Sequence, residues 1–474
     1  MSESVPSVRA IDGIPSDGPP DTGAPLALWL DWIDAVHPHE MELGLARVGR
    51  VAARLGLSEP PLVVVTVGGT NGKGSTVAML EAIWTAAGYR TGAATSPHVR
   101  RFNERMRVAG REAEDTAIVR ALARVEAARE ARDGESDTLT YFEFATLGAM
   151  SLFVESGCDV AIMEVGLGGR LDAVNLWDTD CAVLTSIALD HAEWLGTDIA
   201  VIATEKAAIG RPGRPLVLGE RAPPASLEGY VRTHGIELVD VGRQAPESLP
   251  RTSLAGLHQR RNAACALAAV RALESRLPVA DSLAREALGN VGLAARFEER
   301  TLGSVPSAMQ ASDSPSEGTP TTLVIDVAHN PAGAAELVAT WRARFGTIRG
   351  VAVFAALADK DIEGIAEALA SIVDHWCCPA LGAGRAIAPE ALAARVRAGL
   401  ERARVLERDG GGRSVTAVSE RGSTTVPAPI ALETFASAGE ALARALALAG
   451  RERLPILVCG SFVTVTAVLD ALGE

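Results

Sequence analysis

The stretch Leu62–Ser75, which reads LVVVTVGGTNGKGS, decides the fold class. Its first six residues are apolar or β-branched and predict a buried strand, and the glycine-rich run Gly68–Gly74 predicts a tight turn. A helical stretch, Ser75–Ala87, follows. A strand, a glycine-rich turn and a helix in this order form the setting in which backbone N–H groups and a helix N-terminus bind phosphate. The stretch therefore predicts a phosphate-binding loop in an α/β fold.

This loop departs from the strict phosphate-loop pattern G-x-x-x-x-G-K-[ST]. Val67 stands where the first glycine is expected, Gly74 follows Lys73, and the hydroxyl comes one residue later, at Ser75. Backbone N–H groups can still surround a polyphosphate, and Lys73 can neutralise its outer oxygens. The alternative interpretation is a tight glycine turn that binds nothing.

Lysine is rare in this chain. Of its 45 lysine and arginine residues, three are lysines: Lys73, Lys206 and Lys360. A lysine amine binds phosphate as a compact charge and, once deprotonated, attacks carbonyl carbon, which a guanidinium does not do. The pattern predicts positions that need an amine, although chance retention of one of the three stays open.

Strand-like and helix-like segments alternate along the rest of the chain. Besides 62–67, we expect strands at 159–165, 181–186, 215–218, 322–327, 350–354 and 456–459, and a helical period over 26–57. Such alternation predicts mostly parallel sheets with helices on both faces. A second βαβ unit is expected to start near Arg296, with polar, Pro- and Gly-rich loops at 304–321 and 409–429.

Length, composition and charge limit the classes of protein that fit. The 474 residues exceed one ordinary domain, and 48% hydrophobic residues exclude a wholly disordered chain. A net charge of −14 argues against a protein that binds nucleic acid through its phosphates, and no apolar run reaches the ~18 residues that a bilayer span needs. We expect residues 1–25 to be a flexible leader, the six cysteines to be reduced and buried, and the protein to be cytoplasmic.

Polar residues follow two further predicted strands. Glu164 ends one of them, and a carboxylate at the carboxyl end of a parallel strand is a good Mg²⁺ ligand, although Glu164 could instead cap the turn. The glycines at 166–169 lack the third glycine of a dinucleotide fingerprint, so we reject an NAD site. His191 follows the next strand, and Lys206 comes one helix later.

Distinctive motifs run in order through nearly the whole chain. They are His37-Pro38 with GLARV at 44–48, GTNGKGS at 69–75, TSPH at 95–98 with RFNER at 101–105, TYFE at 140–143, EVGLGGRLDA at 164–173, DH at 190–191, EK at 205–206, HQ at 258–259 with Asn262, DVAHNP at 326–331, ADKD at 358–361 and GS at 460–461. With these motifs the chain resembles the folylpolyglutamate synthase/dihydrofolate synthase branch of the Mur ligase superfamily.

The resemblance implies an ATP-dependent amide ligase with its active site in a cleft between two α/β domains. Residues 26–295 would form an N-terminal P-loop-type domain that binds ATP and the pterin, with a mostly parallel sheet and helices on both faces. Residues 296–474 would form a smaller, Rossmann-like glutamate ligase domain. A substrate carboxylate would attack the γ-phosphate of ATP, and the amino group of L-glutamate would then attack the acyl phosphate. The implied substrates are 7,8-dihydropteroate, folates, L-glutamate and ATP, for a monomer without nucleic-acid or membrane partners.

Motif positions also imply roles for single residues. The catalytic set would be Lys73, Glu164, His191 and Lys206. The nucleotide would contact Asn71, Gly72, Lys73, Gly74, Ser75, Asn262, Arg296, Asp326 and His329. The pterin would contact Thr140, Tyr141, Phe142 and Glu143. Two Mg²⁺ ions would be held by Ser96, Glu164, His191 and Lys206, the last carbamylated by CO₂ so that it supplies oxygen ligands.

Two places depart from the family pattern. Ala295 stands where the family usually has glycine, and Gly460–Thr464 differs from the usual pair of aromatic residues after the serine. Lys360 is placed near the nucleotide by family pattern alone, with a solvated surface lysine as the alternative. For the function, the alternatives are polyglutamylation only, a Mur-type ligase on another acid, and a P-loop ATPase or binding module that is no ligase.

Overall fold

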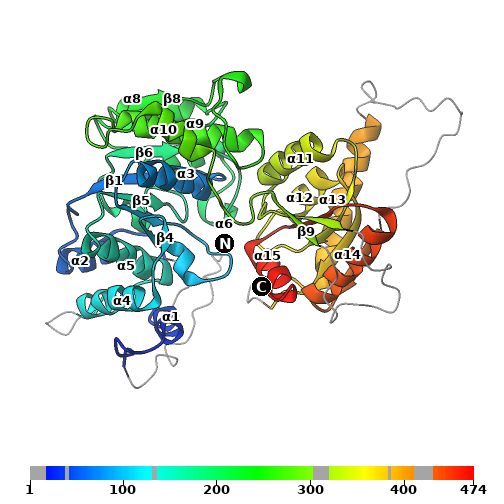
Figure 1. Cartoon of the computed structure of the whole chain (residues 1–474), viewed down its shortest axis with the longest axis horizontal. Coiled ribbons are helices and arrows are strands. Elements are labelled where there is room, and N and C mark those ends of the chain that lie inside the picture. The colour runs from blue at the N-terminus through cyan, green and yellow to red at the C-terminus, as the bar shows by residue number, and fades with distance from the viewer. Residues whose placement is uncertain (1–17, 38–41, 131–135, 303–319, 383–385, 410–430) are drawn as a thin grey trace, which may run out of the picture. The chain divides into compact units, whose positions relative to one another are not determined.

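The computed structural model describes residues 18–37, 42–130, 136–302, 320–382, 386–409 and 431–474 (Figure 1). The chain divides into two compact units, one of Met1–Ser253 with His258–Gly292 and one of Leu254–Leu257 with Leu293–Glu474. Most of the predicted leader (1–25) and of the predicted loops (304–321 and 409–429) lies outside the described residues. The predicted domain boundary at 295/296 stays a prediction.

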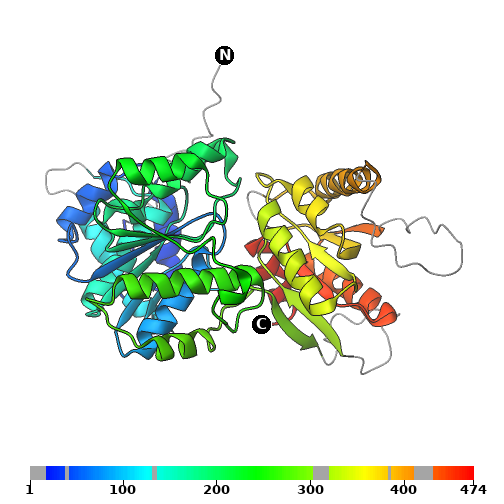
Figure 2. The same ribbon diagram turned by 90° about the horizontal axis from the view of Figure 1, so that it is seen from above.

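The first unit is built on an eight-stranded sheet around the strand that the sequence marks most clearly. This strand is β1 (Val63–Gly68), and the sheet order is β4-β3-β2-β5-β1-β6-β7-β8. The other strands are β2 (Thr91–Ala94), β3 (Met106–Val108), β4 (Arg111–Glu112), β5 (Val160–Glu164), β6 (Cys181–Leu184), β7 (Pro215–Leu218) and β8 (Glu237–Asp240). All pairs are parallel except β2–β3 and β3–β4. Because β1 has parallel neighbours and helices on both faces, it is apolar without alternation (Figure 2).

The helices of the first unit follow the strands as the alternating pattern predicts. They are α1 (Leu26–Ala35), α2 (Ala46–Arg54), α3 (Lys73–Ala86), α4 (Asp115–Arg129), α5 (Tyr141–Glu155), α6 (Ala192–Leu195), α7 (Ile199–Ala207), α8 (Ala225–Thr233), α9 (Leu257–Ala272) and α10 (Asp281–Leu288), with 3₁₀ turns η2 (Phe102–Arg105), η3 (Ala173–Leu176) and η4 (Pro246–Ser248). The helical period expected over 26–57 is confirmed in part: it contains α1 and α2, which are separate helices. Gly44, which lies between the two helices, has φ 152°, a backbone angle that no α-helix contains.

The second unit contains a six-stranded sheet of order β13-β12-β11-β14-β10-β9, parallel except for the β9–β10 pair. Its strands are β9 (Glu298–Leu302), β10 (Thr321–Ile325), β11 (Gly350–Phe354), β12 (Val373–Pro379), β13 (Ala431–Phe435) and β14 (Ile456–Cys459). Its helices are α11 (Pro331–Phe345), α12 (Ile362–Leu369), α13 (Pro389–Asp409), α14 (Ala438–Glu452) and α15 (Phe462–Ala471). The predicted fold class, two α/β units with mostly parallel sheets, is confirmed.

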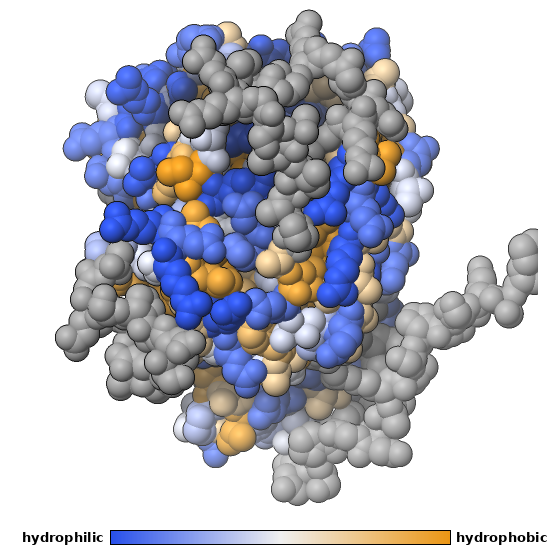
Figure 3. Space-filling model, turned by 90° about the vertical axis from the view of Figure 1, so that its right-hand side faces the viewer, coloured by the Kyte–Doolittle hydropathy of each residue, from blue (hydrophilic) through white to orange (hydrophobic). Residues whose placement is uncertain are grey.

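One face of the surface and the burial of the cysteines can be described directly. The face drawn in Figure 3 is largely hydrophilic, with its apolar residues in separate small groups. All six cysteines are buried and free, as predicted. Among the described residues, no helix combines the length and the apolar character needed to cross a membrane.

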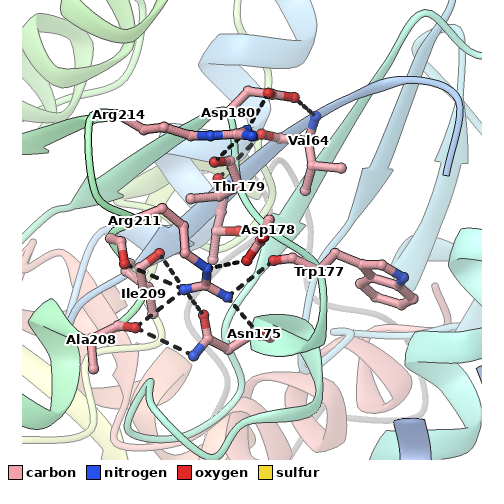
Figure 4. A network of polar contacts seen from close by, with 12 residues as sticks. Val64, Asn175, Trp177, Asp178, Thr179, Asp180, Ala208, Ile209, Arg211 and Arg214 are labelled. Atoms are coloured by element: carbon pink, nitrogen blue, oxygen red, sulfur yellow. Dashed lines mark hydrogen bonds and ion pairs between the residues drawn. The ribbon is translucent and has the colours of Figure 1, made fainter. Parts of the chain in front are cut away.

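Arg211 ties the end of α7 to the segment around η3 (Figure 4). Its Nη1 donates to the carbonyl of Ile209 at 3.3 Å and to the side-chain oxygen of Asn175 at 3.0 Å. Its Nη2 donates to the carbonyls of Asn175 at 2.9 Å and of Trp177 at 3.3 Å, and its Nε pairs with Asp178. Carbonyls just past a helix end lack helical partners, so this guanidinium satisfies them and complements the helix dipole.

We expect Arg211→Ala to lower the free energy of unfolding of the first unit by about 2–3 kcal/mol, because several buried carbonyls lose a charged donor at once. Urea unfolding followed by tryptophan fluorescence measures this loss. Arg243→Ala is the matched control: Arg243 pairs with Glu228 but its side chain is 60% exposed, so the expected loss is below about 0.5 kcal/mol. Equal effects of the two substitutions would contradict the role of Arg211 in holding the end of α7 to the segment around η3.

Candidate active site

The glycine-rich loop after β1 passes so close to its neighbours that two of its positions exclude a side chain. Gly69 has φ 137° and Gly72 has φ 90°, backbone angles that other residues rarely adopt. A Cβ at Gly72 would lie 2.6 Å from the side-chain oxygen of Asn262, which comes from α9. Asn262 and the loop, both predicted to contact the nucleotide, therefore lie side by side. The N–H groups of the first turn of α3 point out of the helix at this end, the geometry that binds phosphate.

Two hydroxyls that sequence reasoning missed fix this loop. Thr185 Oγ1 donates to the carbonyl of Asn71 at 2.7 Å, and Ser186 Oγ accepts from the N–H of Asn71 at 2.9 Å. Both residues directly follow β6, which pairs with β1. The signal in the sequence was a pair of hydroxyl residues directly after a predicted strand. It pointed to the loop only once β6 was known to lie beside β1.

Two of the three lysines meet at one oxygen of the loop. Lys73 Nζ donates to the carbonyl of Gly69 at 3.0 Å and to that of Thr70 at 3.0 Å. Lys206 Nζ, which is buried, donates to the same Gly69 carbonyl at 3.3 Å. Burial, and next the charge of Lys73, lower the pKa of Lys206 to about 7. Near neutral pH a large share of Lys206 is thus a neutral amine.

The segment 166–172 packs directly on the end of α7 that carries Lys206. A Cβ at Gly169 would lie 2.7 Å from the carbonyl oxygen of Glu205, and the N–H of Arg170 donates to that carbonyl at 3.1 Å. Asp172 shapes the segment: its carboxylate accepts from the N–H groups of Leu167 and Val174, each at 2.9 Å. Burial raises the pKa of Asp172 to about 6, against these hydrogen bonds.

Ser96 and Glu164, the predicted ligands of one metal ion, lie together. Glu164 ends β5, is buried, and its Oε2 accepts from the N–H of Ser96 at 3.1 Å. Ser96 follows β2, the strand that pairs with β5, so both residues stand at the carboxyl edge of the sheet. Within the ranges that the structure describes, no group of three or more His, Cys, Asp or Glu side chains is arranged to hold a metal ion.

His191, predicted for the second metal ion, is linked to Lys206 through its neighbour Asp190. The N–H of His191 donates to Asp190 Oδ1 at 2.9 Å, and its Nε2 lies 4.0 Å from Asp190 Oδ2. His191 has φ 52° at the start of α6, and its side chain is half-buried. The carboxylate of Asp190 is near enough to Lys206 to oppose the fall of its pKa. Asp190 therefore belongs to the surroundings of Lys206, although it was not among the predicted site residues.

The four residues predicted to contact a pterin divide into two pairs. Thr140 and Glu143 form a capping box at the start of α5: the N–H of Thr140 donates to Glu143 Oε2 at 2.8 Å, and the N–H of Glu143 donates to Thr140 Oγ1 at 3.2 Å. Arg47 also holds the buried Glu143 carboxylate, at 2.9 Å. The side chains of Thr140 and Glu143 therefore form hydrogen bonds that hold the start of α5. Tyr141 and Phe142 are half-buried, and their role in binding stays a prediction.

Tyr141 and Phe142 lie beside the carboxyl edge that holds Glu164. A Cβ at Gly166, two residues after Glu164, would lie 2.8 Å from the ring of Phe142. The ring of Tyr141 meets that of Phe102 edge to face, with 5.9 Å between the centroids. Arg105 places its guanidinium carbon 5.4 Å from the centre of the Tyr141 ring. Phe142 thus lies close to the segment that follows Glu164, and Tyr141 packs against Phe102 and Arg105.

In the second unit, Arg296, Asp326 and His329 gather around Phe462. The guanidinium of Arg296 lies 5.5 Å from the centre of the Phe462 ring, and the ring of His329 lies 6.3 Å from it. The Asp326 carboxylate accepts from the N–H of Phe297 at 2.8 Å; burial raises its pKa, which the charge of Arg296 opposes. In the sequence, Phe462 stood out only because the segment that contains it departs from the family pattern. Its place next to Gly460-Ser461 was the signal that it belongs with these residues.

Lys360 is buried in the second unit, which contradicts the alternative of a solvated surface lysine. Its Nζ lies 3.9 Å from Asp359 Oδ2, and its carbonyl accepts from Arg395 at 2.9 Å. A buried amine beside a carboxylate keeps its charge paired. Its predicted place near the nucleotide stays a prediction.

A phosphate-binding loop on a mostly parallel sheet, joined to a second α/β unit, defines the class of nucleotide-dependent ligases with the Mur architecture. Comparison with known proteins agrees: residues 67–218 match the Mur ligase middle domain, and residues 314–462 match the Mur ligase, glutamate ligase domain.

Individual relatives narrow the class. The dihydrofolate synthase/folylpolyglutamate synthase of Escherichia coli is 38% identical over 96% of this chain and 97% of its own length, and that of Mycobacterium tuberculosis is 30% identical over 91% and 90%. Among solved structures, E. coli FolC in complex with DHPP and ADP has a TM-score of 0.77 at 35% identity, covering 96% of this chain and 99% of that one. A bifunctional folylpolyglutamate synthase/dihydrofolate synthase with Mn, AMPPNP and L-glutamate bound has a TM-score of 0.75 at 34% identity, covering 96% and 100%. The chain belongs to the dihydrofolate synthase/folylpolyglutamate synthase family.

The residue before Arg296 explains one departure from the family pattern. Ala295 is buried and has φ 55°, in the left-handed region where glycine is favoured. Its N–H donates to Glu298 at 2.9 Å and its carbonyl accepts from Val327 at 3.1 Å, so the strained backbone is held in place. The backbone at this position thus suits glycine, and this chain holds an alanine in it.

We expect Ala295→Gly to raise the free energy of unfolding of the second unit by about 1 kcal/mol, because the left-handed backbone costs an alanine more than it costs glycine. Thermal unfolding by calorimetry measures the gain. Ala294→Gly is the matched control: Ala294 is exposed and is not among the positive-φ residues, so the expected result is a loss of about 0.5 kcal/mol. A loss from both substitutions would show that the backbone at 295 carries no strain.

Proposed function

We propose that this chain is an ATP-dependent ligase that joins L-glutamate to 7,8-dihydropteroate and to folates. The observation that carries the proposal is the meeting of Lys73 and Lys206 at the Gly69 carbonyl, at the N-terminus of α3. This arrangement gathers N–H donors and two lysine amines around one loop, which suits a polyphosphate and a reaction that builds up negative charge. Relatives that are 38% and 37% identical bear the name of both synthase activities, which supports the dual function.

The reaction needs an activated acid, because a carboxylate is a poor electrophile at neutral pH. One oxygen of the substrate carboxylate attacks the γ-phosphorus of ATP, the bond to the β-phosphate oxygen breaks, and ADP leaves. The amino nitrogen of L-glutamate then attacks the acyl carbon, loses a proton, and expels phosphate. Loop N–H groups bind the phosphates in both steps, and the Lys73 ammonium offsets the charge on the transferred group.

The residues at the carboxyl edge fit a divalent cation. The buried Glu164 carboxylate and the neighbouring Ser96 offer oxygen donors next to the phosphate loop, and Mg²⁺ is commonly held by one or two carboxylates together with substrate phosphates. His191 and Lys206 would hold a second ion, as the sequence predicts. Such ions supply charge stabilisation for the phosphates. Relatives solved with AMPPNP and Mn support binding of a nucleotide and a divalent metal here.

Lys206 fits carbamylation for two reasons. Its pKa of about 7 leaves a neutral amine, the form that attacks CO₂, available at neutral pH. Its buried amine also lies next to Lys73, which would neutralise the negative carbamate. The modification turns a nitrogen into a pair of oxygens, which Mg²⁺ prefers.

The remaining predicted residues would contact the pterin and the nucleotide. Tyr141 and Phe142 would border the pterin ring, and Thr140 and Glu143, which also form the capping box of α5, would contact the pterin as the sequence predicts. Asn262, Arg296, Asp326 and His329 would contact the nucleotide. A monomeric state and a cytoplasmic location stay predictions from the sequence.

Release of ADP in the presence of ATP, L-glutamate and either dihydropteroate or tetrahydrofolate tests the function. We expect glutamate-dependent release with both acids, and a product heavier by one glutamyl unit in mass spectrometry. No turnover with dihydropteroate would remove the dihydrofolate synthase half. Release that needs no glutamate would instead support a plain ATPase.

Lys73→Ala is expected to lower the rate at least ~100-fold, since it removes a charge aimed at the phosphates.

Lys206→Arg tests the carbamate. It keeps the positive charge, but a guanidinium does not form the carbamate, so the rate should fall at least ~10-fold, the scale of lost metal support. Solution ¹³C NMR with ¹³C-bicarbonate should show a carbamate signal that grows as pH rises through about 7. The signal should vanish in Lys206→Arg and remain in the matched variant Lys360→Arg. Near-normal turnover of Lys206→Arg, or a signal that survives it, would refute the modification at this residue.

A further inference from the structure

Arg105 stands at the same sheet edge as Ser96 and Glu164. It ends η2, and its carbonyl accepts from the N–H of Thr95 at 3.1 Å, which fixes it opposite the end of β2. The charge of Glu164 acts on it, so the two side chains share one electrostatic environment. Its position was absent from the set of residues predicted for the site.

The partners of the Arg105 guanidinium are neutral. Its Nε donates to Nδ1 of His98 at 2.8 Å; an arginine only donates, so this imidazole nitrogen carries no proton. Its remaining faces lie against the rings of Phe102, at 5.7 Å, and Tyr141, at 5.4 Å. Within the part of the chain that the structure describes, no carboxylate forms an ion pair with Arg105. Arg107, two residues further, pairs with Glu81 at 2.9 Å.

This combination is costly unless an anion binds there. Aromatic and imidazole neighbours return only part of the solvation that a guanidinium loses in such surroundings, and the charges of Glu164 and Glu104 act on it without an ion pair in the described part of the chain. A guanidinium presents a planar set of donors that matches a carboxylate in a two-pronged contact. The site is therefore shaped for a planar anion.

The place of Arg105 also selects which anion. Tyr141 and Phe102 stand on one side of it, and the Ser96–Glu164 edge next to the phosphate loop stands near it. A pteroic acid has a ring system at one end and its reacting carboxylate at the other. We propose, resting on the function proposed above, that Arg105 binds the carboxylate that is to be phosphorylated and aims it at the nucleotide. His98 positions the guanidinium through its Nδ1.

Affinity for dihydropteroate and for its primary carboxamide tests this role, measured by fluorescence titration in the presence of a non-hydrolysable ATP analogue. The wild type should prefer the acid. Arg105→Gln should weaken binding of the acid by about tenfold to a hundredfold and change that of the amide less than twofold, since a lost charged contact is worth this much. Arg101→Gln, an exposed arginine on the same turn, is the matched control and should leave both affinities unchanged.

Each outcome separates this role from others. Equal weakening of acid and amide in Arg105→Gln would assign Arg105 to the ring or to the fold, and an unchanged preference for the acid would exclude it from carboxylate binding; both overturn the inference. Arg105→Lys, which keeps the charge without the flat pair of donors, should retain part of the preference and covers the case in which Arg105→Gln does not fold. A wild type that ligates glutamate but binds acid and amide alike refutes the inference alone. A wild type that neither binds nor ligates any pteroic acid refutes the proposed function, and the inference falls with it.

Discussion

Two lysine amines sharing one carbonyl oxygen are the constraint on which the site depends. Lys73, which is half-buried, and the buried Lys206 both reach the Gly69 oxygen, and positive charges at such a distance repel each other. Burial, and next this repulsion, lower the pKa of Lys206, and the place becomes one that stabilises added negative charge. The arrangement holds only if the loop and the end of α7 are fixed. Thr185 and Ser186 fix the first, and the Arg211 network fixes the second.

The parts of the fold that could be predicted are those in which local sequence and tertiary structure agree. β1 and α3 were found because a buried parallel strand is continuously apolar and a helix that follows a glycine turn is amphipathic or apolar over its whole length. The scarcity of lysine marked Lys73, Lys206 and Lys360 as positions that need an amine, and the structure brings the first two together at the Gly69 carbonyl. The helical period expected over 26–57 was confirmed only in part, because periodicity reports burial and does not report where a chain turns.

The parts that could not be predicted depend on contacts between distant segments. Glu143 could be matched to a motif, yet its carboxylate is held by Arg47, 96 residues earlier, and by the start of its own helix. Thr185 acts on a loop more than a hundred residues away, and this pairing exists only because β6 lies beside β1. Ala295 shows the opposite case: the family pattern marked the position, but only the backbone angle explains why glycine belongs there.

The division of labour between arginine and lysine gives the site its chemistry. Arginine keeps its proton at any physiological pH, so it serves where a fixed charge must be held flat or must cap several carbonyls, as Arg211 does between Asn175 and Ile209. Arg105 differs from such arginines, since its Nε meets a neutral imidazole and its guanidinium lies near two aromatic rings. A lysine amine can lose its proton when it is buried, as the pKa of Lys206 shows. A chain that uses arginine for almost all of its cationic side chains can thus keep a reactive amine at one place without competing amines elsewhere on its surface.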